Sequence, residues 1–146
     1  MYERVGTYAG KKSLGEIADQ AKTFDVAWAA DGHGTTTEHL TMVRDAFAAD
    51  LAETIPGVWA RSMLVMLAPG GNIPVHRDLP LAAESVRYHL VLTTNPRCWN
   101  YHDGGFQQLE EGGVYTVDMT AEHASINWGE TQRTHLVVDV LPGREI

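Results

Sequence analysis

The sequence predicts a mainly β protein, a double-stranded β-helix (jelly roll or cupin) with N-terminal helices packed on one sheet. Two observations favour this fold. From Val58 onward, short runs rich in apolar residues are separated by Gly, Pro and Asn, as in a sandwich or barrel. Up to about residue 56, the apolar residues instead recur at helical spacing.

Length and composition narrow the possible classes of protein. At 146 residues, we expect a single domain over 1–146, with a helical part at 1–56 and a jelly-roll core at 57–146. A net charge of −8 and the lack of any apolar run long enough to span a membrane argue against nucleic-acid and membrane partners. The single cysteine, Cys98, cannot form an internal disulfide, and no secretory signal pattern is present, so we expect a cytoplasmic protein.

The helical part contains two capping boxes, in which a Ser or Thr precedes a Glu by three residues. One spans Ser13–Glu16 and the other Thr35–Glu38. The second box opens an amphipathic stretch that we expect to end at Pro56. Its apolar positions are Leu40, Val43, Phe47 and Leu51.

The second part predicts strands separated by tight turns. Pro69-Gly70-Gly71-Asn72 and Glu111-Gly112-Gly113 have turn composition. We expect strands near 60–68, 72–77, 85–93, 97–102, 113–118, 122–127 and 132–140.

A candidate metal site comes from two of these strands. His76 and Asp78 are two residues apart, so on a strand they face the same side. His123 must come from another strand. Two imidazoles and one carboxylate form the facial triad that leaves open positions on a non-haem Fe(II). The alternative is that His76 and Asp78 are a surface or hydrogen-bonded pair without a metal.

Arg133 makes the metal assignment more specific. It lies ten residues after His123, on the expected neighbouring strand, where a guanidinium can bind the far carboxylate of a keto acid. Together these residues predict an Fe(II)- and 2-oxoglutarate-dependent dioxygenase. Two alternatives remain: a non-oxygenase metal cupin such as an isomerase, in which Arg133 would lack this role, and a ligand-binding sensor without turnover.

Arg87 and His89 share one face of a strongly alternating strand. Buried cationic groups need partners, and a dicarboxylate ligand would supply them. The alternative is an internal ion pair of Arg87 with Asp118 or Glu84.

Several other side chains have open assignments. His102 precedes a Gly-Gly turn and is expected to be exposed, whereas His135 shares a strand face with Arg133 and either lines the cavity or packs in the core. The aromatic residues Trp99, Tyr101 and Trp128 either belong to the core or close over substrate.

The segment from about Leu67 to Val140 resembles the aspartyl/asparaginyl β-hydroxylase family of Fe(II)/2-oxoglutarate-dependent dioxygenases and the related bacterial proline hydroxylases. The resemblance implies hydroxylation of an unactivated C–H of an amino acid or a peptide side chain, with O₂ consumed and succinate and CO₂ as co-products. The substrate would be a small molecule or peptide, and the oligomeric state is left open. The matching text comprises Leu67–Asp78, Arg87–Leu92, Gly113–Asp118, His123, Asn127 and Arg133–Asp139.

The resemblance also implies roles for individual residues. Asp78 stands where some peptide-modifying members have Gly, so the triad is complete and fills the coordination position that a halide would need. Val65 stands where those members use a Ser, for which Ser62 and Thr116 are possible substitutes. The implied roles are iron ligation by His76, Asp78 and His123, binding of the distal carboxylate by Arg133, and support of the metal-chelating carboxylate by Arg87 and His89.

Overall fold

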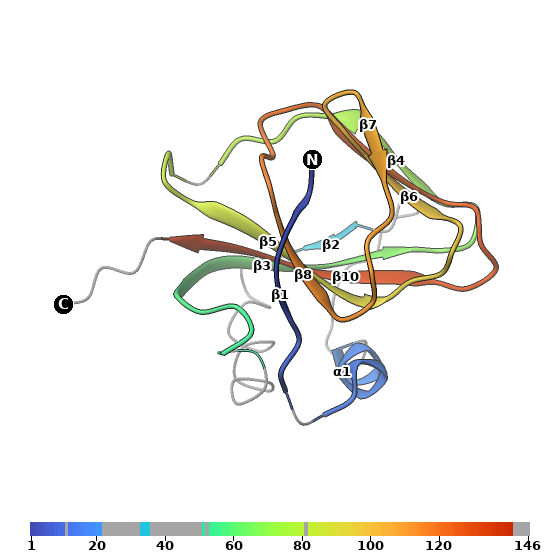
Figure 1. Cartoon of the computed structure of the whole chain (residues 1–146), viewed down its shortest axis with the longest axis horizontal. Helices are drawn as coiled ribbons and strands as arrows, with labels where there is room; N and C mark the ends of the chain where they lie inside the picture. Colours follow the sequence, from blue (N-terminus) through green and yellow to red (C-terminus); the bar gives the residue numbers. More distant parts are fainter. Residues whose placement is uncertain (11, 22–32, 36–50, 52, 81, 142–146) are drawn as a thin grey trace.

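The computed structural model describes residues 1–10, 12–21, 33–35, 51, 53–80 and 82–141. Two antiparallel sheets face each other (Figure 1). The six-stranded sheet has the order β1-β8-β5-β10-β3-β2 and the four-stranded sheet the order β4-β9-β6-β7. The elements are β1 (Glu3–Thr7), α1 (Leu14–Ala21), β2 (His33–Thr35), β3 (Val58–Leu67), β4 (Asn72–His76), β5 (Val86–Thr93), β6 (Cys98–His102), β7 (Gly105–Gln107), β8 (Gly113–Val117), β9 (His123–Asn127) and β10 (Arg133–Leu141).

The connectivity from β3 to β10 is that of a double-stranded β-helix. The chain alternates between the two sheets from β3 to β6, turns back through the β6–β7 hairpin, and alternates again from β7 to β10. This confirms the mainly β jelly-roll prediction. All seven expected strands occur within about two residues of their expected bounds, and β7 was not expected.

The two predicted turns have the geometry that their glycines permit. Gly71 N–H donates to the Ala68 carbonyl at 2.8 Å, and Gly70 has a φ of 82°. In the second turn, Gly113 N–H donates to Glu110 at 3.0 Å and Gly112 has a φ of 80°. A positive φ at the third position defines a type II turn, which favours Gly there.

The expectation that residues 1–56 are helical is wrong in two places, because residues 3–7 and 33–35 are strands. β1 pairs with β8 and β2 pairs with β3, at opposite edges of the six-stranded sheet. The edge strands of a sheet have unpaired backbone groups, and a short extended segment satisfies them even without apolar alternation.

The first capping box forms as expected. Glu16 N–H donates to the Ser13 hydroxyl at 3.1 Å, and that hydroxyl donates to the Glu16 carboxylate at 3.2 Å. α1 begins at the next residue after Ser13. The second box and the amphipathic stretch that follows lie, apart from Thr35, Leu51 and residues 53–56, outside the described residues.

The main apolar core lies on the outer face of the six-stranded sheet, where α1 packs on the side away from the four-stranded sheet (Figure 1). Ile17 and Ala18 of α1 share this cluster with Leu90, Leu136 and Val138. No helix in the described part of the chain is long and apolar enough to span a membrane. The interior between the sheets contains several buried polar side chains, including Arg87, Asn100, His102, His123, Arg133, His135 and Asp139.

Candidate metal centre

The structure brings together the three predicted metal ligands. His76 ends β4 and His123 begins β9, and the two are cross-strand partners with ring centroids 4.2 Å apart. Asp78 follows β4, and its N–H donates to the Met119 carbonyl at 2.9 Å. One potential ligand atom from each of these three residues lies within 4.8 Å of the other two.

Hydrogen bonds to the backbone fix which ring nitrogen of each histidine faces Asp78. His76 Nδ1 lies 2.7 Å from the Pro74 carbonyl, and His123 Nδ1 lies 2.9 Å from the Ala121 carbonyl. A carbonyl oxygen only accepts, so each Nδ1 carries a hydrogen, and Nε2 is the ring nitrogen that faces Asp78. Those Nε2 atoms lie 3.4 and 3.1 Å from Asp78 Oδ2. Each Nε2 can donate to Asp78 when it is protonated and can bind a metal when it is not. Three potential ligand atoms thus converge on one point, and this ligand set fits a divalent cation.

Arg87 supports the carboxylate of Asp78, one of the candidate metal ligands. Its Nη1 donates to Asp78 Oδ2 at 3.0 Å, while Nε and Nη2 donate to the two Asp139 oxygens at 2.8 and 3.0 Å. Arg87 and Asp139 are cross-strand partners on β5 and β10 and both are buried. The hydrogen bond from His123, followed by the charges of Arg87 and His76, holds the pKa of Asp78 well below its ordinary value despite partial burial. Asp78 is therefore an oriented anion at neutral pH.

The internal partner of Arg87 is Asp139, not Asp118 or Glu84. Asp118 is exposed and its carboxylate accepts from Thr120, and Glu84 is exposed. Sequence reasoning missed Asp139, although it lies on the same period-two face of β10 as Arg133 and His135. Three of the five N–H groups of Arg87 are already used in these hydrogen bonds. The contact of Arg87 with a co-substrate carboxylate stays a prediction, and it would use the remaining N–H groups.

His89 lies beside this centre and pairs with His135. Their Nδ1 atoms are 3.1 Å apart, so one ring donates to the other. Burial, reinforced by the charges of nearby arginines, holds the pKa of both rings well below the ordinary value. Both rings are consequently neutral near pH 7, and His135 is buried against His89 within the interior.

Arg133 is a buried cation with few partners. Its side chain is 2% exposed, and Nη1 donates to Asn100 Oδ1 at 3.3 Å. Among the residues that the structure describes, Nε has no hydrogen-bond partner and no carboxylate pairs with the guanidinium. Burial lowers the pKa of Arg133 to about 10, so the guanidinium remains charged at neutral pH. An unpaired buried charge is costly, and an anionic ligand would compensate it.

The expectation that His102 is exposed is wrong. The residue is 6% exposed, its Nε2 donates to the Asp118 carbonyl at 2.9 Å, and its buried Nδ1 has no partner. His102 lies opposite His123 across β6 and β9, so the two side chains face the same interior. The reason is the alternation of β6, which directs Asn100 and His102 inward.

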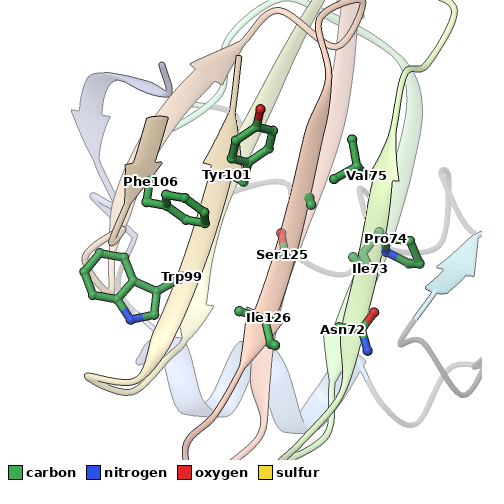
Figure 2. Close-up of a pocket in the computed structure, with 10 residues that line it drawn as sticks. Asn72, Ile73, Pro74, Val75, Trp99, Tyr101, Phe106, Ser125 and Ile126 are labelled. Atoms are coloured by element: carbon green, nitrogen blue, oxygen red, sulfur yellow. The ribbon is translucent and has the colours of Figure 1, made fainter. Parts of the chain in front are cut away.

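The same alternation directs Trp99 and Tyr101 outward. With Val75, Phe106 and Ile126 they line an apolar groove on the outer face of the four-stranded sheet, shown in Figure 2. These aromatic rings therefore lie on the opposite side of the sheet from the metal ligands. Trp128 is 59% exposed.

Neither predicted substitute for the missing Ser faces the interior. Ser62 lies opposite Val138, a member of the outer core cluster, and Thr116 lies opposite Tyr88, which packs on that cluster. Val65, by contrast, belongs to a cluster with Ile73 and Val137 between the sheets. The hydroxyls of Ser62 and Thr116 thus lie on the wrong face to contact a ligand in the interior.

The fold and this donor set define a double-stranded β-helix with a candidate two-histidine, one-carboxylate metal centre. A model of the aspartyl/asparaginyl β-hydroxylase family matches residues 35–142, and the chain belongs to that family.

Solved structures similar to this chain include several cupin proteins. A cupin domain from Bordetella pertussis has 23% identity and a TM-score of 0.46, covering 59% of this chain and 85% of that chain. A predicted oxalate decarboxylase from Thermotoga maritima has 18% identity and a TM-score of 0.45, covering 62% and 73%. The Cnp3 cupin domain from Schizosaccharomyces pombe has 12% identity and a TM-score of 0.45, covering 56% of this chain and only 55% of that chain.

Proposed function

We propose that this protein is an Fe(II)- and 2-oxoglutarate-dependent dioxygenase that hydroxylates an unactivated C–H of an amino acid or a peptide side chain. The observation that carries the proposal is Arg133, a buried charge for which the described residues supply no counterion. It lies in the same interior as the convergent ligand atoms of His76, Asp78 and His123. A 2-oxo dicarboxylic acid has a carboxylate for Arg133 and a keto-acid group for a metal, so it matches both features.

His76, Asp78 and His123 would hold the iron through two imidazoles and one carboxylate. The bound iron would supply O₂ activation coupled to decarboxylation of 2-oxoglutarate, with succinate and CO₂ as co-products. The Pro74 and Ala121 carbonyls orient the two rings, and Arg87 holds the Asp78 carboxylate by a hydrogen bond.

Arg133 would bind the distal carboxylate with charge-assisted hydrogen bonds. Its side chain is buried, and burial strengthens such bonds relative to those in water. The neutral His89 would offer its remaining ring nitrogen to the keto-acid end without adding a second charge. Because Arg133 would bind one end of the co-substrate and the triad the other, these residues would set the orientation of the co-substrate in the interior.

Anaerobic titration of the Fe(II) protein with 2-oxoglutarate tests this function. We expect a metal-to-ligand charge-transfer band that saturates at one equivalent, and succinate formation when O₂ is admitted. Arg133→Ala should weaken 2-oxoglutarate binding about tenfold or more while iron affinity stays near the parent value. The matched control is Arg97→Ala, which removes an exposed guanidinium.

The outcomes separate this proposal from its alternatives. A non-oxygenase metal cupin would bind iron but show neither the band nor succinate. A sensor would show ligand binding without turnover in the presence of O₂ and a panel of amino acids and peptides. Unchanged 2-oxoglutarate affinity in Arg133→Ala would remove Arg133 from the proposed site.

A further inference from the structure

Tyr2 is buried in the interior between the two sheets although it lies at the start of the chain. Its side chain is 5% exposed. The ring packs edge-on against His89 of the six-stranded sheet, with centroids 5.3 Å apart, and against His102 of the four-stranded sheet at 5.9 Å. Tyr2 therefore bridges the two inner faces that carry the polar residues of the site.

Hydrogen bonds to β7 hold this residue in place. Tyr2 N–H donates to Gln107 Oε1 at 3.0 Å, and Gln107 Nε2 donates to the Tyr2 carbonyl at 2.9 Å. In Figure 1 the dark blue segment from the N-terminus runs down from the region between the sheets, through β1, towards α1. Tyr2 together with β1 is called the N-terminal strap below.

The anchor of the strap is linked to Arg133 through one residue. Gln107 lies opposite Asn100 across β7 and β6, and Asn100 Oδ1 accepts the one hydrogen bond that Arg133 donates among the described residues. The strap is thus fixed to β7, the neighbour of the strand β6 whose Asn100 amide faces the buried guanidinium. The position of Tyr2 is therefore set by hydrogen bonds of its backbone to the Gln107 side chain as well as by apolar packing.

The Tyr2 hydroxyl has no hydrogen-bond partner within the described part of the chain. Burial raises the pKa of Tyr2 to about 12, and the charge of Arg133 is the strongest of those that oppose this rise. The phenol is therefore a neutral O–H donor within electrostatic reach of Arg133, whose Nε–H is also without a partner among the described residues. An anion that accepts from both groups would satisfy both donors at once.

We propose that Tyr2 is a ligand-binding residue of the co-substrate pocket, and that its hydroxyl donates to the carboxylate bound by Arg133. The inference rests on the proposed function and extends it to a residue outside the family match at 35–142. The ligand class is a 2-oxo acid with a second carboxylate, and the N-terminal strap completes its site.

The test compares Tyr2→Phe with the parent by anaerobic titration of the Fe(II) protein with two keto acids. 2-Oxoglutarate has the distal carboxylate, whereas 2-oxobutanoate lacks it. Tyr2→Phe keeps the ring between His89 and His102, so we expect 2-oxoglutarate affinity to fall on the order of tenfold. Affinity for 2-oxobutanoate and for Fe(II) should stay unchanged. Tyr101→Phe, which removes a hydroxyl from the outer groove, is the control.

A second variant, Gln107→Ala, removes both side-chain bonds to the strap and leaves Tyr2 intact. It should also lower 2-oxoglutarate affinity without changing Fe(II) affinity. Equal losses for both keto acids in Tyr2→Phe, or parental 2-oxoglutarate affinity, would reduce Tyr2 to a packing residue and overturn this inference alone. A parent protein that gives no band with 2-oxoglutarate would instead overturn the proposed function.

Discussion

Two buried arginines of the six-stranded sheet differ in almost every contact. Arg87 donates three hydrogen bonds to the carboxylates of Asp78 and Asp139. Arg133 donates one bond, at 3.3 Å, to the neutral amide of Asn100. We call the part of the interior around Arg87 and Asp78 the metal end. There the hydrogen-bonding groups of the arginine are satisfied by the protein itself, whereas Arg133 leaves N–H groups for a ligand to satisfy.

This difference indicates a structural role for Arg87 and a ligand-binding role for Arg133. Removing one partner of a buried ion pair leaves the other charge uncompensated, which is strongly destabilising. Removing a buried charge that has no counterion removes a cost instead. Substitution of each arginine by Met, which keeps an unbranched side chain, should therefore have opposite effects on the free energy of unfolding.

The largest expected effect is that of Arg87→Met. The change leaves Asp139, which is fully buried, without its bidentate partner. We expect the free energy of unfolding to fall by about 3–5 kcal/mol, measured by urea denaturation of the metal-free protein. Arg97→Met at an exposed position should change it by less than about 0.5 kcal/mol. A loss below about 1 kcal/mol in Arg87→Met would mean that the metal end is not held by this pair.

His123→Ala tests the metal end directly. Loss of a supporting hydrogen bond to a ligand typically costs 10–100-fold in metal affinity, so loss of a ligand should cost at least about a hundredfold. We expect no Fe(II) binding at stoichiometric metal and a far-UV circular dichroism spectrum like that of the parent. Parental iron affinity in this variant would exclude His123 as a ligand.

The buried pair of His89 and His135 predicts a smaller, pH-dependent effect. Burial depresses both folded pKa values, so below about pH 6.5 the unfolded chain binds more protons than the folded one. Stability should be fully present above that pH and decline as pH falls, by at most about 1.4 kcal/mol per pH unit for each ring. His135→Gln should show a shallower decline in urea denaturation between about pH 7 and 5. An identical slope in variant and parent would argue against buried neutral rings.

The strands and the pairing of His76 with Asp78 could be predicted from sequence because both depend on local spacing. His123 comes from another strand and meets them through the pairing of β4 with β9. The turn before β4 is fixed by Pro69 and Gly70. The short β7 could not be predicted, since its three residues begin within a Gly-Gly pair and show no periodicity. β1 is an exposed edge strand that gains its stability from pairing with β8 rather than from its own pattern.

The partners in the interior could not be predicted, because they depend on strand register. Arg87 and Asp139 are 52 residues apart and meet only through the pairing of β5 with β10. The place of His102 before a Gly-Gly turn predicts exposure, but a polar site occupies the interior, so His102 faces inward and Tyr101 faces outward.

The most direct test of the account combines two readouts on Arg133→Met. We predict a metal-free protein at least as stable as the parent in urea, and an Fe(II) protein whose 2-oxoglutarate affinity is weaker by about tenfold or more in anaerobic titration. Affinity for Fe(II) should be unchanged. A destabilised protein that binds 2-oxoglutarate as tightly as the parent would show that Arg133 is structural, and would contradict the assignment of this end of the interior to the co-substrate.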